Sequence, residues 1–143
     1  FAHALDGLCR LALDDDAHAL DEALDRLRMV DAKFRLAYVL SRAALLHLER
    51  GRPARAVEQA REALAAAEPL QRATEMLLAH LVLARSAGPG SEDYDRHVAA
   101  MKSLYSAPIS TWARERATET LSQVTEIKEC DWSSDVCSSD LVT

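Results

Sequence analysis

The chain has 143 residues and a formal net charge of −6, with 17 Lys and Arg against 23 Asp and Glu. This length suits one domain with one core, and the mild acidic excess argues against a basic nucleic-acid-binding face. Arg42 interrupts the longest apolar stretch, Leu36 to Leu48, so no run reaches the roughly 18–20 residues of a membrane helix. We therefore expect a cytoplasmic protein that contacts neither nucleic acid nor membrane.

Apolar residues recur at three- and four-residue steps, which is typical of amphipathic helices. The pattern predicts an all-α protein of about seven helices. We expect the first to end near Leu13, the second to run from an Asp16 cap to Val30, and the third from an Asp31 cap to Leu48. The fourth is predicted from Pro53 to about Ala67, the fifth from Pro69 to a break at Gly88, the sixth from a Ser91 cap to Leu104, and the seventh from Pro108 through Val124.

The clearest helix boundary lies between the third and fourth helices. Gly51 can take the left-handed conformation that ends a helix, and Pro53 suits the first turn of the next. Short loops between such helices favour antiparallel hairpins. The second, fourth and sixth helices begin about 36–39 residues apart, which favours an α-solenoid of stacked hairpins, with a helical bundle as the alternative. Their apolar faces are expected to include Leu5, Val30, Phe34 and Trp112.

Small residues recur in the third and fourth predicted helices, with Ala44 in the third and Ala56 and Ala63 in the fourth. Through these positions, residues 37–70 resemble one tetratricopeptide repeat, a family that places small residues where the two helices of a pair touch. Gly51 stands at the usual turn of the family. The likeness is weaker elsewhere, so we describe the chain as tetratricopeptide-like.

In tetratricopeptide proteins the first helix of each pair lines a concave groove. The resemblance implies that the third and fifth helices offer partner-binding residues to this groove, namely Tyr38, Ser41, Leu45, Leu48, Arg72, Glu75 and Ala79. Members that clamp a terminal carboxylate carry Lys and Asn at such positions, and Ser41 and Leu45 are neither. We therefore expect an apolar or helical protein or peptide partner. The alternative is that these residues pack against neighbouring repeats of a longer chain.

The segment 131–141 reads DWSSDVCSSDL. It resembles the codon-by-codon translation of a short-read sequencing-library adapter, so we interpret it as an artefact and exclude it from the fold prediction. Three of the 23 acidic residues lie there, which leaves 20 against 17 basic residues and a net charge of −3. On this interpretation residues 126–130 are of uncertain origin. We expect a helical-repeat fragment over residues 1–129, truncated at both ends, and a non-biological tail over residues 130–143.

Cysteine usage follows from that interpretation. Cys130 and Cys137 fall in or beside the tail, so their spacing predicts neither a metal site nor redox chemistry. Cys9 is then the one secure thiol, and its place inside a Leu-rich helix is typical of a small buried hydrophobe.

Two charged clusters could bind a ligand. Residues 14–16, all Asp, lie near His18 and could hold a hard metal ion, but a solvated turn with a helix cap is favoured. No two histidines have the i, i+4 spacing of a zinc site, and we interpret His47 and His80 as core or interface residues. A modest basic patch could meet an acidic partner, although a solvated turn is again favoured; it consists of Arg50, Arg52, Arg55 and Arg61.

The sequence carries no GxSxG, HExxH or phosphate-binding loop. We therefore predict no enzyme activity and no cofactor. The preferred interpretation is a non-catalytic protein-interaction or scaffold module of a larger, regulatory bacterial protein. The alternative is an effector-sensing domain that controls an attached ATPase or DNA-binding domain and binds its ligand between the third and fifth helices.

Overall fold

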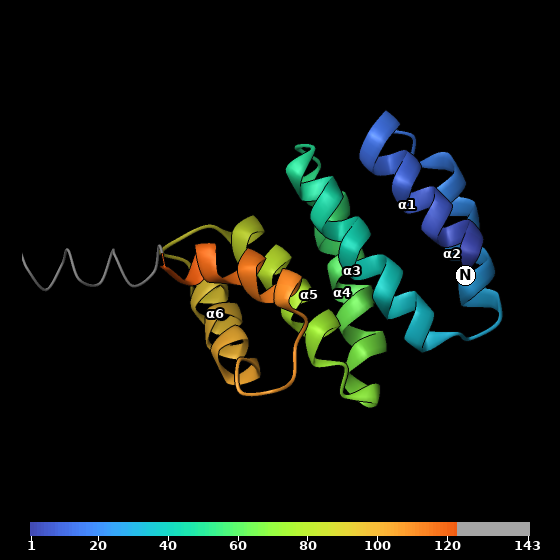
Figure 1. The fold of residues 1–143 in the computed structure, drawn as a ribbon. Helices are drawn as coiled ribbons and strands as arrows, with labels where there is room; N and C mark the ends of the chain where they lie inside the picture. The colour runs from blue at the N-terminus through green and yellow to red at the C-terminus, as the bar shows by residue number, and fades with distance from the viewer. Residues whose placement is uncertain (123–143) are drawn as a thin grey trace, which may run out of the picture.

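A computed structural model describes residues 1–122, which form helices and turns without a strand (Figure 1). The prediction of an all-α protein is therefore confirmed. The helices are α1 (Ala2–Asp14), α2 (His18–Met29), α3 (Lys33–Glu49), α4 (Pro53–Ala67), the 3-10 helix η1 (Glu68–Leu70), α5 (Ala73–Ala87) and α6 (Glu92–Leu104). A further helix covers residues 111–122, to the end of the described chain.

Each α-helix from α1 to α6 packs against the next, and α3 also packs against α1 and α5. In Figure 1, α1, α3 and the 111–122 helix lie next to one another on the face toward the viewer, with α2 and α4 behind. No helix in the described part is both long and apolar enough to span a bilayer.

Small residues allow the helices in the middle of the protein to approach closely. Ala44, Ala56 and Ala63 are fully buried in the main core cluster. Ala37 of α3 lies in a second cluster with Ala66 and Ala67 of α4. Methyl side chains keep the two helix axes near each other, and the larger side chains around them fill the remaining space.

The first hairpin achieves close approach through a glycine that the sequence analysis did not single out. Gly7 of α1 is buried against Leu20 of α2. A Cβ at Gly7 would lie 2.7 Å from the Leu20 Cα and 2.8 Å from its backbone nitrogen. These are backbone atoms, so no side-chain rotation could relieve the clash.

Several predicted helix ends are confirmed. Gly51 has φ 71°, in the left-handed region, and Pro53 stands in the first turn of α4. Ser91 caps α6, and its Oγ accepts a hydrogen bond from the Tyr94 backbone N–H at 3.1 Å. The predicted cap at Asp16 is wrong by one residue, because Ala17 is the N-cap of α2, although Asp16 Oδ1 accepts from the His18 N–H at 3.0 Å. The predicted cap at Asp31 is wrong, because that residue is left-handed (φ 48°) and Ala32 is the N-cap.

Two helix starts predicted at prolines are also wrong. The fifth helix begins at Ala73, because Pro69 belongs to η1, and Gln71 then turns the chain with φ 51°. The last helix begins at residue 111, where Ser110 Oγ accepts from the Ala113 N–H at 3.3 Å, so Pro108 lies in the preceding loop. Proline suits a first helical turn, yet a 3-10 turn or a loop accepts it equally well.

Some apolar residues expected on buried faces are exposed. Leu5, Phe34 and Trp112 are 36%, 48% and 41% exposed, and Val30 at the end of α2 is 71% exposed. Three predicted features lie outside the described residues: Val124, the segment of uncertain origin at 126–130, and the proposed tail at 130–143.

Candidate functional site

The acidic turn before α2 and the basic patch after α3 pair with each other. Asp15 forms ion pairs with Arg50, at 3.2 Å, and with Arg52. Arg55 likewise pairs with Asp21 of α2. These contacts fasten the first hairpin to the turn between α3 and α4. Three of the four arginines of the basic patch are thus paired within the chain, whereas Asp14, Asp16 and Arg61 form no ion pair within residues 1–122.

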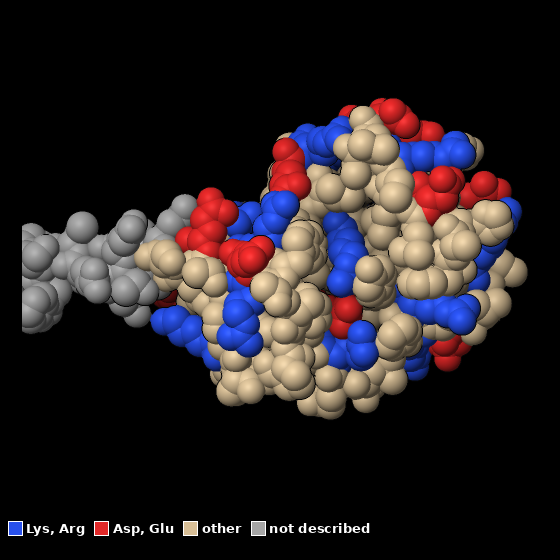
Figure 2. All heavy atoms as spheres, in the orientation of Figure 1, with Lys and Arg blue, Asp and Glu red and all other residues tan. Residues whose placement is uncertain are grey.

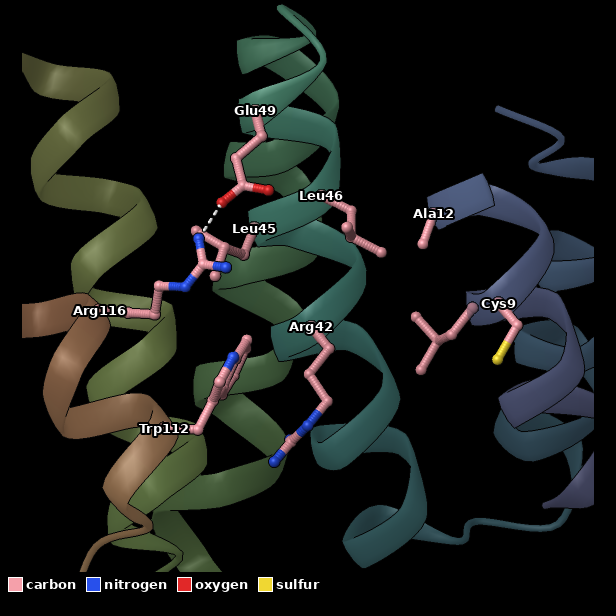
Figure 3. A pocket seen from close by; sticks show the side chains of 9 residues that line it. Cys9, Ala12, Arg42, Leu45, Leu46, Glu49, Trp112 and Arg116 are labelled. Atoms are coloured by element: carbon pink, nitrogen blue, oxygen red, sulfur yellow. Dashed lines mark hydrogen bonds and ion pairs between the residues drawn. The ribbon is translucent and has the colours of Figure 1, made fainter. Parts of the chain in front are cut away.

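A pocket of about 270 Å³ lies between α1, α3 and the 111–122 helix (Figure 3). Its lining residues come from these three helices and none from α5; they are Leu8, Cys9, Ala12, Arg42, Leu45, Leu46, Glu49, Trp112 and Arg116. We call this the α1–α3 pocket. It is not the cleft between the third and fifth helices that the sequence analysis expected for a ligand.

The α1 wall of this pocket includes the thiol. Leu8 and Leu11 of α1 turn into the core, so the intervening positions face outward, and Cys9 is exposed at the pocket. The prediction that Cys9 is buried is therefore wrong. Opposite it, the Trp112 side chain projects from the 111–122 helix toward α3 (Figure 3). Its partial exposure is explained by this position on the wall of a pocket.

Charged groups gather on the side of the pocket between α3 and the 111–122 helix. Arg116 Nη1 donates to Glu49 Oε1 at 2.6 Å, the dashed line in Figure 3. The Arg42 guanidinium carbon lies 3.5 Å from the centroid of the Tyr38 ring and 5.8 Å from that of Trp112. Stacking on aromatic faces holds a guanidinium in one orientation while its edges remain able to donate hydrogen bonds.

Beside the pocket, a carboxylate is buried between two arginines. Glu75 of α5 is 1% exposed; its Oε1 lies 3.4 Å from Arg42 Nη1 and its Oε2 lies 3.2 Å from Arg72 Nε. The Arg72 guanidinium in turn covers the Phe34 ring at 4.2 Å. A buried carboxylate is tolerated because it is paired and hydrogen-bonded. We call Phe34, Tyr38, Arg42, Arg72 and Glu75 the arginine–aromatic cluster.

The structure places the seven predicted groove residues in different surroundings. Tyr38, Arg72 and Glu75 come together in the arginine–aromatic cluster. Leu45 lines the α1–α3 pocket, and Leu48 is partly buried against the core. Ser41 and Ala79 are fully buried, and the Ser41 hydroxyl donates to the Tyr38 carbonyl at 3.1 Å.

The sequence analysis missed Arg42, Trp112 and Arg116 as site residues. Arg42 follows Tyr38 by four positions, which places both on one face of α3, and this spacing could have identified it. Trp112 and Arg116 are also four positions apart, but nothing local indicates that their helix lies opposite α3. Glu49 and Arg116 are separated by 67 positions in the chain.

Two histidines have strongly lowered pKa values. Burial, with Arg55 and Arg52 nearby, lowers the pKa of His47 to about 4. Burial and the neighbouring His97 lower the pKa of His80 to about 4; the two Nδ1 atoms are 3.0 Å apart, so one donates to the other. Within residues 1–122 no three His, Cys, Asp or Glu side chains are grouped so that they could hold a metal ion.

No protein-family model matches the chain, and neither the curated proteins nor the solved structures give a significant match.

Proposed function

We propose that this chain is a non-catalytic protein-interaction module, built from stacked tetratricopeptide-like hairpins and belonging to a larger bacterial regulatory protein. The observation that carries the proposal is the α1–α3 pocket. Most of its wall is apolar, and its charged residues, Arg42, Glu49 and Arg116, lie on the side between α3 and the 111–122 helix. In this scheme α1 and α3 are each the first helix of a hairpin, and the 111–122 helix lies across the pocket from α1. A partner seated across them would contact a groove made by several repeats.

The size of the pocket supports a side chain as its occupant. At about 270 Å³, it lies just below the roughly 300–1,000 Å³ typical of small-molecule sites. Leu46 of α3 is partly buried and Trp112 of the 111–122 helix is 41% exposed, so an incoming apolar side chain would remove apolar surface of both helices from water. One anchor residue of a peptide or helix fits this description better than a whole metabolite.

The proposal can be tested by selecting displayed peptides against the full chain. We expect a set of peptides whose binding is abolished by Leu46→Glu, which places a charge in the apolar wall. Leu13→Glu on α1 is the matched control, because Leu13 is 81% exposed and does not line the pocket. Circular dichroism would check that both variants remain helical. Failure to recover any peptide sensitive to Leu46→Glu would contradict the proposal.

The effector-sensing alternative would use the same pocket with a different occupant. It predicts that a small molecule raises the melting temperature of the wild-type chain but not that of Leu46→Glu. Such a ligand, found together with an absence of pocket-dependent peptides, would favour this alternative over the interaction module.

A further inference from the structure

We infer that the segment bound at the α1–α3 pocket is acidic, with a large apolar side chain in the pocket and an Asp or Glu next to it that is attracted to the positive rim formed by Arg42 and Arg116. This inference rests on the proposed function and specifies the chemistry of the partner. It follows from the unused donors of the two arginines, from the charge balance of the rim, and from the neighbouring apolar wall.

In the described part of the chain, Arg42 and Arg116 both leave the Nε and Nη2 edge of the guanidinium group available to donate hydrogen bonds. Within residues 1–122, the hydrogen bonds of Arg42 all leave from Nη1, to the Tyr38 carbonyl, the Ser41 hydroxyl and the Glu75 carboxylate. Arg116 also uses only Nη1, toward Glu49. In each, Nε and Nη2 make no hydrogen bond in this part of the chain. These two nitrogens form the side edge of a guanidinium, whose parallel N–H groups match the two oxygens of a carboxylate.

The rim has more positive than negative charge. Glu49 is the one carboxylate that lines the pocket, against two guanidinium groups. Glu49 already accepts from Arg116, and the carboxylate near Arg42 is Glu75, which is shared with Arg72. A net positive rim therefore remains, although the chain as a whole is acidic. Charge complementarity across an interface favours an anionic partner here.

The positive rim borders an apolar surface. Figure 2 shows basic side chains along the middle of this face, with an acidic side chain between them and broad areas without charge beside them. In Figure 3 the Trp112 ring and the Arg42 guanidinium lie at the same side of the pocket, with Ala12 and Cys9 opposite. A ligand that satisfies both features must carry an apolar group and an anion within a short distance. An Asp or Glu within one or two positions of Leu, Met or Phe supplies both.

The test uses one peptide selected against the full chain and a second in which the acidic residue is replaced by its amide. For wild type, we expect the amide peptide to bind about tenfold to a hundredfold more weakly, as for loss of one charge-assisted pair. Arg116→Gln should lose a similar factor with the acidic peptide and discriminate less between the two peptides. This non-additivity is the mark of a direct contact. High salt should reduce the preference for the acidic peptide.

Two further variants guard against indirect effects. Arg26→Gln is the matched control, because Arg26 is an exposed α2 arginine that pairs with Glu22 and does not line the pocket; we expect unchanged affinity. Arg42→Lys keeps a cation near Glu75 but removes the planar edge, so it should weaken the acidic peptide without unfolding the chain.

The possible outcomes separate this inference from the proposed function. Equal affinity of wild type for the acidic and amide peptides, with binding still abolished by Leu46→Glu, would overturn the acidic partner and leave the interaction module standing. If no peptide depends on Leu46, both proposals fail.

Discussion

The two sides of α3 are stabilised by different kinds of contact. Toward α4, Ala37 packs with Ala66 and Ala67, and Ala44 lies two turns further along the same face. On the other side, Tyr38 and Arg42 belong to the arginine–aromatic cluster, and Glu49 pairs with Arg116. The first side joins helices adjacent in the chain through close packing, whereas the second joins distant segments through charge. We therefore expect the α4 side to determine the fold, and we propose that the other side determines recognition.

The largest expected effect is on the alanine side. Ala56→Leu should lower the free energy of unfolding by about 1–3 kcal/mol, because a fully buried methyl position between two helices cannot accept three more carbons without strain. Ala54→Leu, at an exposed position in the first turn of the same helix, is the control and should have little effect. Urea denaturation of both variants measures the difference. Equal urea midpoints for the two variants would mean that close approach of α3 and α4 does not stabilise this side.

Gly7→Ala extends the same rule to the first hairpin. At an exposed helix position this change would stabilise by about 1 kcal/mol through helix propensity. Here the new methyl would meet backbone atoms of Leu20 at less than 3 Å, so we expect a loss of about 1–3 kcal/mol instead. We expect the melting temperature of Gly7→Ala to be lower than that of wild type. A higher melting temperature would show that α1 and α2 can move apart without a loss of stability.

His47 makes the stability of the α4 side depend on pH. Its pKa is lowered by burial from 6.5 to about 4. Between these values the unfolded chain binds a proton that the folded chain does not, so stability falls as the pH is lowered through this window. From pH 6.5 to 5 the loss due to this group should be about 1–2 kcal/mol. His47→Leu should reduce this acid-side slope.

The smallest effect on stability is expected on the recognition side. Arg116→Gln removes an ion pair whose side chains are 43% and 39% exposed, and such pairs contribute about 0–1 kcal/mol. Its melting temperature should therefore stay close to that of wild type while its peptide affinity falls. A large destabilisation would show that this side also maintains the fold, and the distinction between the two sides of α3 would be lost.

This distinction explains what could be predicted from the sequence. The turn at Gly51 and the burial of Ala44, Ala56 and Ala63 depend on local residue types, and helical periodicity reveals them. The need for glycine at Gly7 could not be predicted, because it arises only from the backbone of α2 that packs against it at Leu20.

The site could not be assembled in the same way. Arg42 and Glu75 are 33 positions apart, and Glu49 and Arg116 are 67 apart. No local pattern encodes such pairs, because they arise only when the helices are brought side by side. Of the helices that line the pocket, the resemblance to a repeat family indicated only α3, and the structure shows that α1 and the 111–122 helix form the opposite walls.

The most direct test of the proposed recognition uses the thiol of the α1–α3 pocket. In the full chain with Cys130→Ser and Cys137→Ser, Cys9 is the remaining thiol, and its rate of alkylation reports whether the pocket is covered. We predict that a saturating acidic peptide slows this reaction several-fold, and that Leu46→Glu abolishes the protection. A peptide that binds by calorimetry but leaves the alkylation rate of Cys9 unchanged would place recognition elsewhere and contradict the account.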